Sequence, residues 1–301
     1  MTRSKASTTF TPFGWHGLEC EVPEAWELAC YDGAYDAGYA SLDDGVDMRL
    51  QVRWNRVRNR PKLLEGALKR YERSLKKAAK GTLRFEAGDP GFVPKRHREG
   101  RDLAAFRWEG DTAAEGLAWY SHATGRLVMV EVLFRGRGVD KALARRVLGS
   151  ARDHRDDGRR LWAVYGFAFL APDHYNLERP ELAPGRLRFE LRAGSHAWLR
   201  VERWAMASQW LDKASIEEWP RELVKLLGLA PRGALEQEEA RVGKHRACRF
   251  TQAVGRGRLG RRQRVTGLVW TCPEDDKVFV VMAGGGAEDL AEEVAATIVC
   301  A

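Results

Sequence analysis

The sequence is poor in the patterns that cross-link a protein or carry it through a membrane. Its five cysteines, Cys20, Cys30, Cys248, Cys272 and Cys300, are odd in number and include no C-x-x-C pair. Neither a disulfide framework nor a zinc site is therefore predicted. No apolar run approaches the ~18 residues that span a bilayer, and the polar N-terminus leads into no apolar signal segment. We expect a reduced, cytoplasmic protein without a membrane span.

Catalytic motifs are also missing. The seven histidines form no H-x-x-x-H or H-E-x-x-H arrangement, and there is no G-x-S-x-G elbow or phosphate-binding P-loop. The nearest approach to a phosphate loop, residues 284–286, is followed by Glu288 and Asp289, which would repel phosphate. We expect no catalytic residue, metal or cofactor. An enzyme with a cleft between two repeats is the third alternative.

An internal repeat organises the 301 residues. Residues 17–28 (GLECEVPEAWEL) match residues 166–177 (GFAFLAPDHYNL) without a gap at Gly, Pro, an acidic residue, an aromatic residue and Leu. Residues 116–119 (GLAW) match 267–270 (GLVW), and each is followed by a basic residue, a strand and a closing helix. Three matches in the same order indicate tandem duplication. We predict a first repeat at 1–153, a short polar linker at 154–160 and a second repeat at 161–301.

Each copy shows the same plan of elements. In the first copy, Pro23 ends one strand, and alternation predicts strands at 39–42 and 48–54 joined by the turn 43–45. A helix follows from Asn59 to Gly81, then strands at 83–87, 103–108, 116–121 and 127–134, then a helix at 139–151. The second copy has its middle helix at 216–227. We therefore predict an α+β fold, with two tandem antiparallel sheets flanked by helices.

The opening motif at residues 17–28, the long central helix and the terminal helix resemble the Mog/PsbP-like fold. Proteins of this fold include a nuclear transport factor, extrinsic photosystem subunits and chaperones for type VI secretion effectors. The resemblance implies a non-catalytic binding protein and transfers no site residue to this chain.

A basic segment is the clearest charged feature. Residues 49–80 contain 12 basic and two acidic side chains, a field that attracts phosphates or acidic surfaces. The glycine-rich segment 135–138 and the arginine-rich hairpin near 256–264 add to it. A solvated helix face that serves solubility would explain the same pattern. The residues predicted for anion or nucleic-acid binding are Arg53, Arg56, Arg58, Arg60, Lys69, Arg73, Lys76, Lys77, Arg135, Arg137, Arg256, Arg258, Arg261 and Arg262.

Tryptophan is abundant, with 11 in the chain. Trp198, Trp204, Trp210 and Trp219 gather in the second copy, where any exposed ring would suit a protein interface. Our leading hypothesis is a non-catalytic, cytoplasmic adaptor or chaperone-like protein that holds a protein partner on its sheet faces. The alternative is nucleic-acid binding through residues 49–80. The sequence does not indicate an oligomeric state.

Overall fold

The computed structural model describes residues 9–59, 62–79, 82–135, 138–212, 215–255 and 262–299. The chain divides into two compact units, Met1–Gly166 and Phe167–Ala301. This boundary falls after the segment expected as a linker, and residues 159–160 begin a strand that pairs within the first unit. Among the described residues, no helix combines the length and the apolar character needed to cross a membrane.

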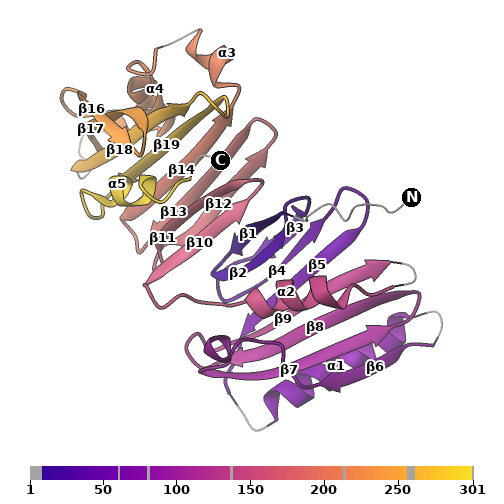
Figure 1. The fold of residues 1–301 in the computed structure, drawn as a ribbon. Coiled ribbons are helices and arrows are strands. Elements are labelled where there is room, and N and C mark those ends of the chain that lie inside the picture. Colours follow the sequence, from indigo (N-terminus) through magenta and orange to yellow (C-terminus); the bar gives the residue numbers. More distant parts are fainter. Residues whose placement is uncertain are drawn as a thin grey trace, which may run out of the picture. The chain divides into compact units, whose positions relative to one another are not determined.

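The first unit contains one seven-stranded antiparallel sheet in the order β3-β4-β5-β9-β8-β7-β6, and a smaller group in the order β10-β1-β2 (Figure 1). Its elements are β1 (Phe10–Trp15), β2 (Leu18–Pro23), β3 (Glu27–Gly33), β4 (Ala37–Asp43), β5 (Met48–Arg56), α1 (Leu63–Ala78), β6 (Arg84–Gly88), the 3-10 turn Lys95–His97, β7 (Arg101–Glu109), β8 (Thr112–Ser121), β9 (Arg126–Arg135), α2 (Lys141–Ser150) and β10 (Arg159–Val164).

The second unit repeats this order as β12-β13-β14-β19-β18-β17-β15, with β16 also paired to β17. Its elements are β11 (Phe167–Pro172), β12 (Asn176–Ala183), β13 (Arg186–Ala193), β14 (Ala197–Ala205), α3 (Ala207–Leu211), α4 (Trp219–Leu226), β15 (Ala230–Pro231), β16 (Glu236–Val242), β17 (His245–Gly255), β18 (Arg262–Cys272), β19 (Lys277–Gly284) and α5 (Leu290–Ala295). In both units, three strands that precede the middle helix form one half of the sheet.

The predicted α+β class is wrong, because strands dominate both units. The described residues form nineteen strands and five α-helices. The middle helix predicted at 216–227 in the second unit is reduced to α4, with Pro220 near its start, and the short α3 precedes it. The fold is thus mainly antiparallel β, with a few helices packed on the sheets.

The predicted turn between β4 and β5 is confirmed, and α2 has a cap that the sequence analysis did not predict. Residues 43–47 turn between β4 and β5, where Asp43 and Asp44 accept backbone hydrogen bonds. Asp140 caps α2 by accepting from the backbone N–H of Leu143 at 3.0 Å. In contrast, α1 begins after Lys62 without a side-chain cap, so the expected cap at Asn59 is wrong.

The middle helix covers only part of its sheet face in each unit. Helix α1 packs on β7 and β8, and α4 packs on β17 and β18. Helix α2 packs against β8, β9 and β2 of the first unit. Helix α5 packs in the same way against β18, β19 and β11 of the second unit. We call the strands β3-β4-β5 and β12-β13-β14, on the face that carries the middle helix, the open half-faces.

One contact explains why the repeat keeps its glycines. Gly116 pairs across the sheet with Phe106, and Gly267 pairs with Phe250. A Cβ atom at Gly116 would lie 2.2 Å from the Phe106 ring, and one at Gly267 would lie 2.4 Å from the Phe250 ring. Both phenylalanines are buried. Each phenylalanine ring fills the space that a side chain on the facing glycine would occupy. Because this contact recurs, both units share the same strand register.

We expect Gly116→Ala and Gly267→Ala each to destabilise the protein by about 1–3 kcal/mol, because a buried ring must leave its place. Gly88→Ala is the matched control, since it also lies in a strand and a Cβ there meets nothing within 4 Å. Urea unfolding followed by circular dichroism measures the difference. Equal stability of all three variants would contradict this account of the register.

Candidate functional site

Four of the basic residues predicted to bind an anion or nucleic acid form ion pairs with acidic residues of the same unit. Lys69 bonds Glu65 and Lys76 bonds Glu72, each at 2.6 Å across one turn of α1. These pairs lie along one stripe of the helix and cancel much of the local charge. Beyond the helix, Arg56 pairs with Asp36 at 3.2 Å and Arg135 with Asp47 at 2.8 Å.

A neighbouring stripe of α1 keeps its charge. Arg70, Arg73 and Lys77 follow one another at spacings of three and four residues, so they project from one flank of the helix. We call these three residues the cationic stripe. Six exposed cations in this region make no ion pair with another described residue: Arg53, Arg58, Lys62, Arg70, Arg73 and Lys77.

Arg53 lies at the junction between α1 and the open half-face of the first unit. Its guanidinium is 5.8 Å from the ring centres of Tyr39 and Tyr71. Tyr71 donates to the buried Glu131 carboxylate at 2.8 Å, and Trp108 donates to its other oxygen at 3.3 Å. Burial raises the pKa of Glu131, while these two donors act in the opposite direction.

The remaining basic predictions have mixed outcomes. Arg262 is exposed at the start of β18. Arg60, Arg137, Arg256, Arg258 and Arg261 lie outside the described residues. Trp54, which follows Arg53 on β5, is buried in the sheet and donates to the carbonyl of Ala34, so it offers no exposed ring for base stacking.

Three of the four predicted tryptophans form one cluster in the second unit. The ring centres of Trp204 and Trp210 are 5.3 Å apart, and Trp219 lies 5.7 Å from Trp204 and 6.5 Å from Trp210. Trp219 is buried, whereas Trp210 is 39% exposed, and Met206, four residues before Trp210, is 46% exposed. We call Trp204, Trp210, Trp219 and Met206 the aromatic cluster.

The open half-face of the second unit carries an ion-pair network that begins at this cluster. Arg186 lies 4.1 Å over the Trp204 ring and bonds Glu202 at 3.0 Å. Arg200 bonds Glu190 at 2.8 Å and approaches Glu202. We call the network the Arg/Glu ladder; its members are Glu181, Arg186, Arg188, Glu190, Arg200 and Glu202.

The ladder is unusually buried for a charged surface. The side chain of Glu202 is 1% exposed and that of Arg200 is 12% exposed. Burial lowers the pKa of Arg200, whereas Glu190 and Glu202 act to raise it. One guanidinium nitrogen of Arg200, Nη1, has no hydrogen-bond partner among the described residues. Arg188 Nε has none either, so the network holds two buried donors that a bound molecule could satisfy.

A cavity of about 670 Å³ adjoins the far end of the ladder. Trp198, the fourth predicted tryptophan, lines it together with Leu229 and Val254. Arg200 and Arg264 supply positive charge on other parts of its wall. Trp198 is thus separated from the other three tryptophans along β14, and it borders a mixed apolar and cationic hollow.

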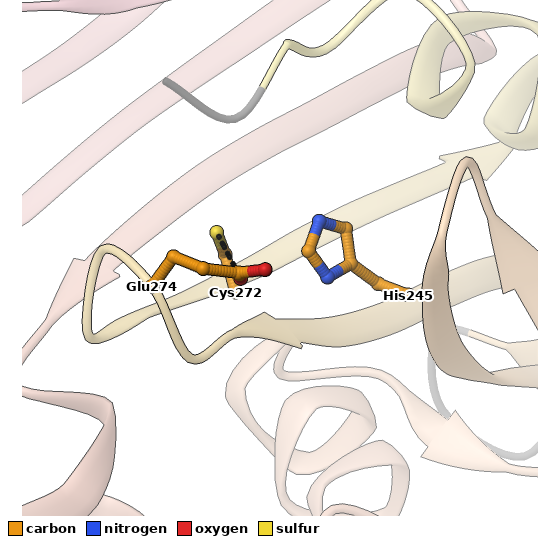
Figure 2. A group of neighbouring side chains, drawn as sticks. All are labelled: His245, Cys272 and Glu274. Carbon is orange, nitrogen blue, oxygen red and sulfur yellow. Dashed lines mark hydrogen bonds between the residues drawn. The ribbon is translucent and has the colours of Figure 1, made fainter.

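A group of potential metal ligands lies elsewhere in the second unit. The ligand atoms of His245, Cys272 and Glu274 all lie within 4.8 Å of one another, and Figure 2 shows the histidine ring directed toward the other two side chains. The Cys272 thiol donates to Glu274 at 3.4 Å. Lys244 bonds Glu274 at 2.7 Å and lowers the pKa of its carboxyl to about 2, so this group is ionised at neutral pH.

Sequence reasoning missed both the ladder and this ligand group. Their members are distant in the sequence and meet through strand pairing. Ala247 lies opposite Trp270 where β17 pairs with β18. His245 lies two residues before Ala247, and Cys272 lies two residues after Trp270, so these two residues also face each other. A prediction of the β17–β18 strand register from the sequence would have placed His245 opposite Cys272.

No family model matches this chain, and no curated protein matches it. A crystal structure of a Bacteroides thetaiotaomicron VPI-5482 protein is similar to 45% of this chain and 45% of its own length, at 17% identity and a TM-score of 0.28. The apo immunity protein TplEi of T6SS from Pseudomonas aeruginosa matches 99% of this chain and 98% of its own, at 11% identity and a TM-score of 0.36. Scores this low carry no argument about fold or function, and the Mog/PsbP-like resemblance stays a prediction.

We expect Arg200→Ala to destabilise the protein by about 1–3 kcal/mol, because Glu190 loses its partner at 2.8 Å and the buried Glu202 loses one of its two guanidinium neighbours. Arg192→Ala is the matched control on the same sheet. Arg192 pairs with Glu178 where both side chains are well exposed, so its loss should cost less than about 1 kcal/mol. Thermal and urea unfolding measure both changes, and equal losses would contradict a buried role for Arg200.

Proposed function

We propose that this chain is a non-catalytic adaptor or chaperone-like protein that holds a protein partner on its uncovered sheet faces. The observation that carries the proposal is the open half-face of the second unit. It presents the aromatic cluster at one end, the Arg/Glu ladder along its strands and a cavity at the other end. Tryptophan and arginine are the residues that dominate protein interfaces.

The chemistry of this surface favours an extended protein segment as its partner. Trp210 and Met206 offer an apolar anchor point, and the adaptable thioether of methionine packs against side chains of varied shape. The ladder offers paired charges, which favour a partner with complementary polar groups and fix its position. The cavity beside Trp198 is large enough for one or two partner side chains.

We also propose a reducing compartment such as the cytoplasm. The four described cysteines, Cys20, Cys30, Cys248 and Cys272, are free thiols. Proteins of oxidising compartments commonly pair such residues in disulfides.

The test begins with proteins retained by the immobilised chain from an extract of its own cells at physiological salt. For a purified partner, we expect Trp210→Ser with Met206→Ser to weaken binding about 30-fold, which corresponds to roughly 2 kcal/mol for a hot spot. Isothermal titration calorimetry measures the change. The control is Val46→Ser with Met48→Ser, an exposed apolar pair in the first unit. Equal affinities of the two variants would exclude the aromatic cluster as the site.

A second candidate function is binding of single-stranded nucleic acid by the first unit. The six exposed cations without ion pairs favour it, as does the position of Arg53 beside Tyr39, since stacking and phosphate contacts act together in such sites. The cationic stripe would supply phosphate contacts.

Fluorescence anisotropy of labelled oligonucleotides at several salt concentrations tests this candidate. Replacing Arg70, Arg73 and Lys77 by glutamine should lower the slope of log K against log salt by about two, or about 0.7 for each lost phosphate contact to a single strand. Arg221→Gln with Lys225→Gln on the exposed side of α4 is the control. Absence of binding at physiological salt would leave the cationic stripe as a solubility feature.

A further inference from the structure

We propose that His245, Cys272 and Glu274 form a binding site for a single Zn²⁺ ion in the second unit. Imidazole nitrogen, thiolate sulfur and carboxylate oxygen are the three ligand types that zinc takes in proteins, usually in tetrahedral geometry. Here one of each is present, and their ligand atoms lie within 4.8 Å of one another. The site is distinct from the aromatic cluster and the ladder, and it does not depend on the proposed function.

Two rigid strands and one adaptable turn supply the ligands. His245 opens β17 and Cys272 closes β18, where neighbouring strand pairing fixes their backbone positions. Glu274 lies in the turn that leads to β19, and its side chain is 53% exposed. Ligand atoms around tetrahedral zinc are roughly 3.3–3.8 Å apart for bonds of about 2.0–2.3 Å. Closing the site therefore requires a movement of about 1 Å, which the exposed glutamate can make.

A fourth oxygen is close by. Asp275 follows Glu274 in the same turn, and its carboxylate lies 3.6 Å from the Cys272 sulfur. The aspartate or a water molecule can complete four ligands. The Cys272 side chain is fully buried, so its sulfur is reached from the side of the turn where the carboxylates stand.

The protein already places a cation at this point. Lys244 bonds Glu274, and its side chain is 69% exposed, so the ammonium group can move into solvent when a metal arrives. Zinc binding forms a Zn–S bond and releases the Cys272 thiol proton to solvent, because only the thiolate is a ligand. No oxidant or reductant is involved in this exchange.

The first unit gives an independent comparison at the same place in the shared register. Counting from Gly116 and Gly267, Ser121 corresponds to Cys272, and Arg101 corresponds to His245. Arg101 pairs with Ser121 across β7 and β8, and its buried guanidinium bonds Asp153 at 3.1 Å. In the first unit, the Asp153 carboxylate is thus paired with the Arg101 guanidinium. The other gathers a histidine, a thiol and two carboxylates, which pair with Lys244 and Lys277, and this set of ligand types suits a metal cation.

The test uses the full chain after treatment with a chelator. Co²⁺ replaces Zn²⁺ as a probe, because its bond to a thiolate gives a charge-transfer absorption band in the near ultraviolet. We expect one Co²⁺ per chain, displaced by Zn²⁺, and a higher midpoint of thermal unfolding with zinc. Cys272→Ser should abolish the band. His245→Gln and Glu274→Gln should weaken zinc binding by on the order of tenfold or more.

Two controls separate this site from adventitious binding. Cys30→Ser removes an exposed thiol in the first unit, and His174→Gln removes an exposed histidine in the second; neither should change the band or the affinity. Glu274 is exposed on a turn, so Glu274→Gln keeps the test decisive even if Cys272→Ser unfolds. An absent band, a band that survives Cys272→Ser, or equal losses in the control variants would overturn the proposal.

Discussion

The rest of the structure follows from a mismatch in width between one helix and one sheet. Seven strands at a spacing of about 4.8 Å make a sheet roughly 30 Å wide, whereas a helix with its side chains is about 10 Å across. The middle helix of each unit therefore covers half of one face. The other half must meet water or a partner, and each unit supplies polar groups there. Arg53 on β5 does so in the first unit, and the Arg/Glu ladder does so in the second.

The shared register makes the two units comparable residue by residue. Phenylalanine rings over Gly116 and Gly267 fix the same strand alignment twice, so positions can be matched without any outside relative. Matched positions have diverged in chemistry while the frame has stayed constant. Arg101 and Ser121 in the first unit correspond to His245 and Cys272 in the second. The duplicated fold thus carries a different set of charged and ligating groups in each copy.

Local patterns in the sequence predicted the features that depend on neighbours along the chain. The turn after Asp43 and the charge run around α1 both belong to this class. The fold class failed because the middle helix of the second copy is reduced to α4, and because the strand Phe10–Trp15, with Pro12 and Gly14, shows no alternation. The ladder and the His245 group arise from cross-strand contacts, which need a register that local patterns do not contain.

The burial of Glu202 also bears on how this surface can change over generations. A well-packed apolar version of the same face need be no less stable than the charged one. If the substitutions occur one at a time, however, the first of them leaves Glu202 or Arg200 buried without one of its charge partners. Selection for foldability removes such intermediates. We therefore expect the charges of the ladder to be replaced together rather than one at a time.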